Sequence, residues 1–265
     1  KVLDDGFVRY VDHMGSDESI VETARVSTGR GFVSWEPYSR CKRCGDVKAG
    51  VSVRRCGDQI DHDERWREGC DSAEFERFPR GDFGILDYML SNYHTTPFEF
   101  GQIVVHGRAP MDEGRQHVRH RLASISEYST RYSPAIDAAA RTGPDKWRSQ
   151  GKTNRQGSGD YLSVGQTREV PDDPNPARQG SGGAYLTQRE GELHVLAREI
   201  YEERLALGVA KEQARKDLPL STYTEAYWRI DLHNLMNTFL SRRLHHHAQE
   251  EIRNYAQAIC NIARQ

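Results

Sequence analysis

The sequence lacks a long apolar run and is poor in hydrophobic residues. Hydrophobic residues make up 36% of its 265 positions, whereas roughly 45–50% is typical of soluble domains when Gly is also counted. No stretch of about 18 apolar residues occurs, which excludes a membrane-spanning helix. Acidic residues stand near the start where the apolar region of a secretory signal would lie, so we expect a cytoplasmic protein.

An excess of charge of one sign is also missing. The formal net charge is -2, so no general basic field indicates nucleic-acid binding. The basic residues are nevertheless unequal, with seven lysines and thirty arginines. Because the planar guanidinium binds phosphate and carboxylate through paired hydrogen bonds, we expect local anion sites.

Cysteine is scarce, with five residues in the chain. An odd number without an export signal argues against a disulfide framework and favours a reducing compartment. Cys41 and Cys44 have the spacing of half a zinc knuckle, and Cys56, Cys70 and a spare His62 would complete a site. The second half lacks a paired Cys-x-x-Cys, so we favour free thiols in a polar loop and no metal.

Periodicity predicts segregated strands and helices, which indicates an α+β fold in a single domain over 1–265. Two polar stretches without a sustained period, 34–80 and 135–190, are interpreted as insertions. No Gly-x-Gly-x-x-Gly follows a strand, so a Rossmann dinucleotide site is not supported. The predicted strands are 7–12 and 100–109. One helix is predicted to begin at Ser16, and five more are predicted at 82–93, 111–124, 189–207, 224–244 and 246–264.

The segment from Arg119 to Tyr132 concentrates chemically active side chains. Three Arg, one His, one Glu and three Ser fall within fourteen residues. A solvated charged face is the usual reading of such a run. Here the charges alternate with small hydroxyls and aromatic rings, which favours a pocket for a phosphate-bearing ligand.

Arg119-His120-Arg121, seven residues, then Ser129 resembles the signature of the flavin-dependent thymidylate synthases, the ThyX family. Further blocks match that family in the same order, and the matches extend from Ser27 to Tyr255. Ordered matches over most of the chain are far more specific than one motif. These blocks are 94–99, 152–159, 218–225, 231–235 and 247–252.

The resemblance implies an enzyme of nucleotide biosynthesis with a mainly antiparallel sheet flanked by helices. Family members are methyltransferases that act on C5 of a uracil nucleotide. Methylenetetrahydrofolate gives the one-carbon unit, and FAD reduced by NADPH supplies the hydride. They use no cysteine nucleophile, so activation of the ring must be electrostatic. They are homotetramers, which would give the predicted helix 224–244 an interface to bury.

The resemblance also assigns roles to residues of this chain. Arg243 and Ser129 match catalytic positions, Arg243 being the group that polarises the uracil edge. Positions that bind the nucleotide are matched by Gln116, Arg119, Glu127, Ser129, Arg131, Arg215 and Arg243. Positions that bind the flavin are matched by Ser27, His94, Thr96, Glu99, Arg119, His120, Arg121, His233 and Asn237.

Several assignments have simpler alternatives. Arg243 could instead be an ordinary arginine on a helix surface. Arg215 could instead form an ion pair with Asp217. The spacing from Asn237 to Arg243 is one residue longer than usual in the family, with Thr238 as the extra residue. Arg242 therefore competes with Arg243, which we prefer because it keeps its distance to His247. Like charges lower the pKa of a histidine, so we expect His120, between two arginines, to be neutral.

Departures from the family pattern bear on the substrate. Ser126 replaces a common Asn, and His117 replaces an aromatic residue. We predict dUMP as the substrate, with the ribonucleotide UMP as the alternative, since one added hydroxyl is hard to reject and small polar groups can meet it. A non-catalytic relative that binds flavin or nucleotide is a second alternative.

Overall fold

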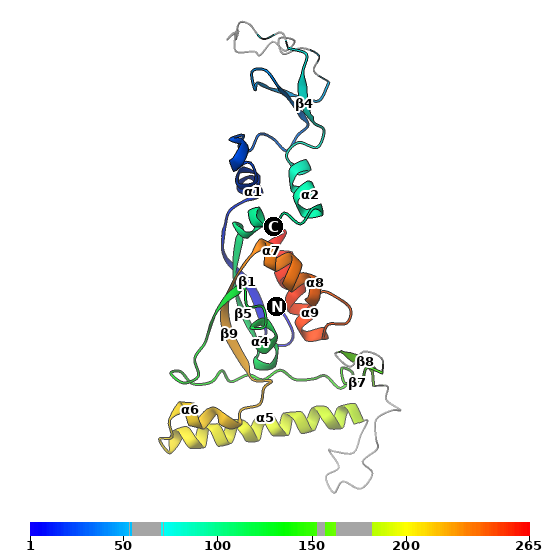
Figure 1. Ribbon diagram of the computed structural model, residues 1–265. Helices are drawn as coiled ribbons and strands as arrows, with labels where there is room; N and C mark the ends of the chain where they lie inside the picture. The colour runs from blue at the N-terminus through cyan, green and yellow to red at the C-terminus, as the bar shows by residue number, and fades with distance from the viewer. Residues whose placement is uncertain (53, 55–69, 71, 153–156, 163–181) are drawn as a thin grey trace. The chain divides into compact units, whose positions relative to one another are not determined.

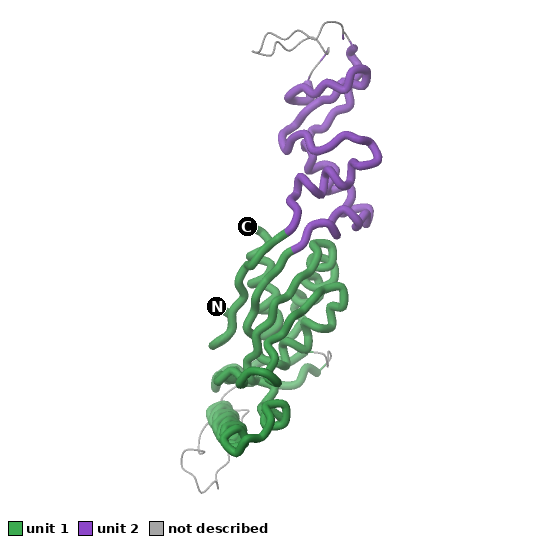
Figure 2. Tube along the Cα trace, turned by 90° about the vertical axis from the view of Figure 1, so that its left-hand side faces the viewer, with its two compact units in different colours: residues 1–13, 103–265 green, residues 14–102 purple. Residues whose placement is uncertain are grey.

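The computed structural model describes residues 1–52, 54, 70, 72–152, 157–162 and 182–265. The chain forms two compact units (Figure 2). Unit 1 comprises residues 1–13 and 103–265, and unit 2 comprises residues 14–102. The prediction of a single domain stays a prediction. Within the described residues, no helix is both long and apolar enough to cross a bilayer.

Unit 1 is built on a four-stranded sheet (Figure 1). The strand order is β1-β5-β9-β6. β6 pairs with β9 antiparallel, with Ala123 opposite Ile230. The predicted α+β class is confirmed by this mixture of helices and antiparallel sheets. The strands are β1 (Phe7–Met14), β5 (Gln102–Pro110), β6 (Ala123–Glu127) and β9 (Tyr223–Asp231).

Two predicted helices of unit 1 were partly wrong. The first half of the helix predicted at 224–244 is strand β9, in which Tyr223, Trp228 and Ile230 are buried. Only after Asp231 does the chain coil, because the Asp231 carboxylate accepts the Asn234 backbone N–H at 2.8 Å and caps the turn. The helix predicted at 111–124 is α4 (Met111–His117), followed by a turn and β6.

The helical segment after β9 contains a π turn. It runs through α7 (Leu232–Asn234), η4 (Leu235–Leu240) and α8 (Ser241–Arg243), and η4 is π-helical. The Ser241 backbone N–H donates to the carbonyl of Met236, five residues earlier. A π turn accommodates one residue more than an α turn. The structure therefore widens the helix where the sequence predicts one extra residue.

The core of unit 1 lies between the sheet and the helices that follow it. Phe239 from η4 is fully buried against Trp228 of β9, with ring centroids 4.8 Å apart. Helix α9 (Glu250–Ala263), predicted at 246–264, contributes Ala256 and Ile259 to the same cluster, and Cys260 is buried as predicted. This packing holds η4 and α8 against the sheet and so fixes the position of Arg243.

A smaller part of unit 1 surrounds the long helix α5 (Gly182–Ala206), which was predicted over 189–207. Gly208 ends it with a φ of +81°, a backbone conformation that favours glycine. Helix α6 (Lys211–Ala214) and η3 (Arg215–Asp217) follow. The stretch predicted as an insertion, 135–190, contributes the short antiparallel pair β7 (Arg148–Gln150) and β8 (Ser158–Tyr161) and the start of α5.

Unit 2 combines helices with a small three-stranded sheet of order β3-β2-β4. Ser16 caps α1 in a capping box with Ser19, as the predicted start of that helix requires. The polar stretch 34–80, in which no period was recognised, contains this sheet. The elements are α1 (Asp17–Ala24), η1 (Val26–Thr28), β2 (Tyr38–Cys41), β3 (Val47–Ala49), β4 (Phe75–Phe78), α2 (Phe83–Ser91) and α3 (Thr96–Glu99).

A buried ion pair joins the parts of unit 2. The Asp82 carboxylate is fully buried and lies 2.6 Å from the guanidinium of Arg25, itself 6% exposed. The hydroxyl of Tyr38 donates to the same carboxylate at 2.7 Å, and the backbone N–H groups of Val33 and Ser34 donate to its other oxygen. Each charge is thus paired and hydrogen-bonded, the condition under which buried charges persist.

Candidate active site

Arg243 lies at the centre of a cluster of predicted site residues in unit 1. Its Nε donates to His120 Nε2 at 3.2 Å, its Nη1 to the side-chain oxygen of Gln116 at 3.2 Å, and its Nη2 to the Gln116 backbone carbonyl at 3.1 Å. The side chain is half-buried, whereas Arg242 is exposed. Arg243 is therefore not an ordinary surface arginine, and three acceptors fix the plane of its guanidinium.

The histidines beside this arginine are neutral. Burial, followed by the charges of Arg243 and Arg242, lowers the pKa of His120 to about 4. The neutral ring agrees with the role of Nε2 as acceptor, which requires that nitrogen to be unprotonated. The predicted lowering of the His120 pKa is confirmed. Its causes are burial and the two arginines of α8, whereas the prediction rested on Arg119 and Arg121.

Glu113 is a buried carboxyl that the sequence analysis missed. It is 4% exposed, and both its oxygens accept from the side-chain amide of Gln116 at 3.2–3.3 Å. Burial raises its pKa to about 8; the carboxylates of Asp112 and Glu251 add to this, and Arg243 and Arg148 oppose it. The spacing of three residues to Gln116 on α4 is the signal that links the two side chains.

The free energy of unfolding of wild type should fall as pH rises, and a Glu113→Gln variant should lack this fall. Between the unfolded pKa near 4.5 and the folded value of about 8, the folded state holds more protons than the unfolded state, so stability falls as pH rises. Urea unfolding at pH 6.5 and 8 should show wild type losing on the order of 1–3 kcal/mol relative to the variant. His117 and His120 still titrate in the unfolded state over this range, because their ordinary pKa is 6.5. Wild type and variant share this contribution, so it cancels in the difference between them.

Glu203→Gln, at an exposed position of α5, serves as the matched control and should leave the slope of wild type unchanged. Equal slopes in wild type and Glu113→Gln would contradict the raised pKa of Glu113.

A second group lies after β6, where the chain turns. The guanidinium of Arg215, in η3, donates to the hydroxyl of Thr130 and so reaches the segment that carries Ser129 and Arg131. The alternative of an ion pair between Arg215 and Asp217 is not what the structure has, because Asp217 pairs with Arg204 at 2.6 Å. Arg131 itself is exposed, with a guanidinium available to an anion.

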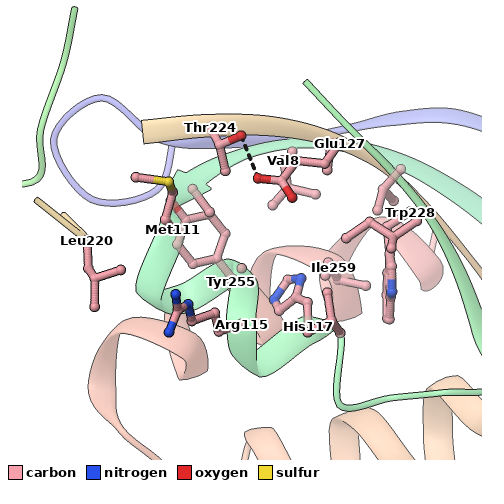
Figure 3. A pocket seen from close by; sticks show the side chains of 17 residues that line it. Val8, Met111, Arg115, His117, Glu127, Leu220, Thr224, Trp228, Tyr255 and Ile259 are labelled. Carbon is pink, nitrogen blue, oxygen red and sulfur yellow. Dashed lines mark hydrogen bonds between the residues drawn. The ribbon is translucent and has the colours of Figure 1, made fainter. Parts of the chain in front are cut away.

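A largely apolar cavity of about 340 Å³ in unit 1 is lined by residues of β5, β6, β9, α4 and α9 (Figure 3). Glu127, at the end of β6, lines it and accepts from the hydroxyl of Thr224 at 3.0 Å. His117 lines it too, with its ring packed against aromatic neighbours and its pKa lowered by burial to about 3. Of the residues predicted for the site, Glu127 lines the cavity and the others do not, within the described part of the chain. The volume suits a small ring.

The residues predicted to bind flavin fall into both units. In unit 1, Arg119 and Arg121 are exposed in the turn between α4 and β6. His233 and Asn237 are hydrogen-bonded to each other across one helical turn at 3.0 Å. In unit 2, Ser27 lies in η1, while His94, Thr96 and Glu99 lie in or beside α3.

Comparison with known proteins decides what this arrangement belongs to. Residues 9–265 match the model of the family described as thymidylate synthase complementing protein. The chain belongs to this family. Flavin-dependent thymidylate synthases from Wolbachia pipientis and Ehrlichia ruminantium strain Gardel are 34% and 36% identical to it. The alignments cover 99% and 100% of this chain and 71% and 68% of those proteins.

Solved structures with a similar fold also match the chain. One is the UMP/dUMP methylase PolB from Streptomyces cacaoi bound with 5-Br dUMP. It is 25% identical, with a TM-score of 0.62, and the match covers 99% of this chain and 92% of that one. The same methylase bound with 5-Br UMP matches with a TM-score of 0.61 at 22% identity.

The donor set of this family member fits a flavin nucleotide. The exposed guanidiniums of Arg119 and Arg121 suit a diphosphate, because arginine binds phosphate through paired hydrogen bonds. The amide of Asn237 and the imidazole of His233 offer hydrogen bonds of the kind that a flavin ring edge needs. In unit 2, Ser27, His94, Thr96 and Glu99 carry hydroxyl, imidazole and carboxylate groups.

Proposed function

We propose that the protein methylates C5 of dUMP to give dTMP. The observation that carries this proposal is the cluster of Gln116, His120 and Arg243, in a chain of the flavin-dependent thymidylate synthase family. Among the described cysteines, none lies in that cluster. Activation of the pyrimidine is then electrostatic, with the fixed guanidinium of Arg243 stabilising negative charge that develops on the uracil ring.

The surrounding residues have supporting roles in this proposal. Neutral His120 and the carbonyl of Gln116 orient the guanidinium without neutralising it, because neither acceptor carries a charge. Ser129, Arg131 and Arg215 bind the nucleotide phosphate, and Arg119, Gln116 and Glu127 make further contacts to the nucleotide. Two arginines near one another suit a dianionic phosphate.

FAD is the proposed resident cofactor, and when reduced by NADPH it supplies the hydride. Methylenetetrahydrofolate supplies the one-carbon unit. The proposed flavin-binding residues in unit 1 are Arg119, His120, Arg121, His233 and Asn237. Those in unit 2 are Ser27, His94, Thr96 and Glu99. These side chains orient three ligands for reaction. The activation barrier is lower because translational and rotational entropy is lost on binding, before the chemical step. A homotetramer and a cytoplasmic location stay predictions.

The test is turnover with each nucleotide in turn. Purified enzyme is incubated with FAD, NADPH, methylenetetrahydrofolate and either dUMP or UMP, and the products are separated by chromatography. We expect dTMP from dUMP, with flavin oxidation coupled to its formation. The absence of a methylated product from both nucleotides would overturn the proposal and would leave a non-catalytic flavin-binding relative.

UMP is the second candidate substrate, and two observations favour it. The structural neighbour PolB is a UMP/dUMP methylase. In this chain Ser126, where the family commonly has Asn, is exposed on β6. A larger kcat/KM for UMP than for dUMP would reverse the order of the two candidates. A Ser126→Asn variant should then shift the ratio back toward dUMP.

A further inference from the structure

Three cysteine sulfurs of unit 2 converge at one end of its small sheet. Cys41 ends β2, Cys44 follows in the turn toward β3, and Cys70 comes from the segment that precedes β4. One ligand atom from each residue lies within 4.8 Å of the others. Cys41 and Cys70 are 29 positions apart in the chain, yet their sulfurs meet. Free thiols in a polar loop would have no reason to lie together in this way.

The spacing of the sulfurs is that of a metal-bound pair. Cys41 Sγ and Cys70 Sγ are 3.7 Å apart. With a zinc–sulfur bond of about 2.3 Å, two thiolates at tetrahedral positions are about 3.8 Å apart. A disulfide would need about 2.05 Å and would use only two of the three sulfurs.

The turn between β2 and β3 presents the sulfurs in the form of a metal knuckle. The Cys41 backbone N–H donates to the carbonyl of Asp46 at 2.8 Å, and Gly45 N–H donates to the Cys41 carbonyl at 3.0 Å. Gly45 has a φ of +78°, which closes the turn and favours glycine. The backbone N–H groups of Cys44 and Arg43 point at the Cys41 sulfur, and they are the kind of outer partner that stabilises a metal-bound thiolate.

Packing does not explain the three cysteines together. Cys41 is 1% exposed, but Cys44 is exposed and contributes little to a core. The sheet is small, with strands of three and four residues. Small sheets that bury little apolar surface commonly depend on a metal or on cross-links for stability.

We propose that Cys41, Cys44 and Cys70 bind a zinc ion and so form a structural metal site in unit 2. The three thiols release their protons on binding, and the three thiolates occupy three of the four tetrahedral positions. This reverses the interpretation of these residues as free thiols. Cys56 and His62, which the sequence also suggested, lie outside the described residues. The site is distinct from the cluster around Arg243 in unit 1.

Metal analysis of the full chain, purified without an added histidine tag, tests the proposal. We expect one zinc per chain in wild type, and after removal of the metal we expect one zinc to be taken up again. Cys44→Ser should lose the zinc, and because Cys44 is exposed this variant should keep the fold. Cys44→His should restore zinc binding, since imidazole is also a zinc ligand.

A second group of potential ligands provides the control. His245, His246 and His247 are exposed and lie close enough together to hold an ion. A His245→Ala/His246→Ala variant should keep the zinc, because the proposed ligands are the cysteines. Loss of zinc in this variant, with zinc retained in Cys44→Ser, would overturn the proposal.

Cobalt substitution gives a readout that does not depend on activity. Co²⁺ added to the metal-free protein should produce thiolate-to-cobalt absorption in wild type and in Cys44→His at reduced intensity, but not in Cys44→Ser. Protein that takes up neither zinc nor cobalt, or a Cys41–Cys70 disulfide found by mass spectrometry in protein purified without reductant, would refute the site. Neither result would affect the methylation assay, so the two proposals fail separately.

Discussion

An Arg243→Ala variant should lose methylation of the nucleotide by about 10²–10³-fold in kcat, the usual cost of removing one preorganised electrostatic donor. The guanidinium is fixed by His120 Nε2 and by two oxygens of Gln116. It therefore needs little reorganisation when charge develops on the ring. Product formation under saturating FAD, NADPH, folate and nucleotide measures the loss, and FAD affinity should change little.

Arg242→Ala is the matched control, because the same residue type stands one position earlier with its side chain exposed. We expect it to retain turnover within a few-fold of wild type. Arg243→Lys should recover little, since an ammonium cannot present a planar fork to three acceptors. If Arg242→Ala lost turnover and Arg243→Ala kept it, Arg242 would be the activating residue. If both variants kept full turnover, neither arginine would activate the uracil ring.

The π turn is the structural reason for expecting this contrast. The hydroxyl of Thr238 donates to the carbonyl of Asn234 at 2.7 Å, and that of Ser241 donates to the carbonyl of Asn237 at 2.6 Å. These bonds satisfy backbone carbonyls in and around η4, where the regular helical pattern is interrupted. The widened turn directs Arg243 toward α4 and leaves Arg242 on the outside.

Asp82→Asn should destabilise unit 2 by about 3–5 kcal/mol, the usual cost of breaking a buried ion pair. The substitution keeps the shape of the side chain but leaves the buried charge of Arg25 without its partner. The Tyr38 hydroxyl also loses a charged acceptor. Denaturant unfolding, followed by hydrogen exchange of peptides from α1, β2 and α2, should locate the loss in this unit.

The control is Asp87→Asn, which removes a partner of Arg80 from an exposed pair with side chains 53% and 64% exposed. Exposed pairs contribute about 0–1 kcal/mol, so a small change is expected. Equal effects of the two substitutions would mean that the Arg25–Asp82 pair does not hold unit 2 together.

The sequence predicted the family and several helices and strands, but it assigned β9 to a helix and gave no strand for β2, β3, β4, β6, β7 or β8. Over 223–231 the residues Glu225, Ala226 and Arg229 are good helix formers, and the apolar residues of the following coil continue the pattern. Pairing with β6 across the sheet overrides that local preference, and pairing partners are not visible in one sequence.

The candidate site was predictable where motifs carry it and hidden where tertiary packing creates it. The resemblance to the family gave Gln116, His120 and Arg243, which the structure brings together. The burial of Glu113 depends on helices from elsewhere in the chain, so its raised pKa had no signal in the local sequence. The meeting of Cys70 with Cys41 likewise depends on a strand pairing, since Cys41 lies opposite Phe75 in the register of β2 and β4.

The order of strands in unit 1 has a consequence for how such chains change length. The chain leaves unit 1 after His13 and returns at Ile103, on β1 and β5, which are neighbours in the sheet. Neighbouring strands lie about 4.8 Å apart, so the sheet itself holds the two ends of this 89-residue excursion together. Each doubling of such a loop costs only about 0.6 kcal/mol of closure entropy. Changes in the length of this segment should therefore alter the stability of the sheet little, so related chains can differ in length here.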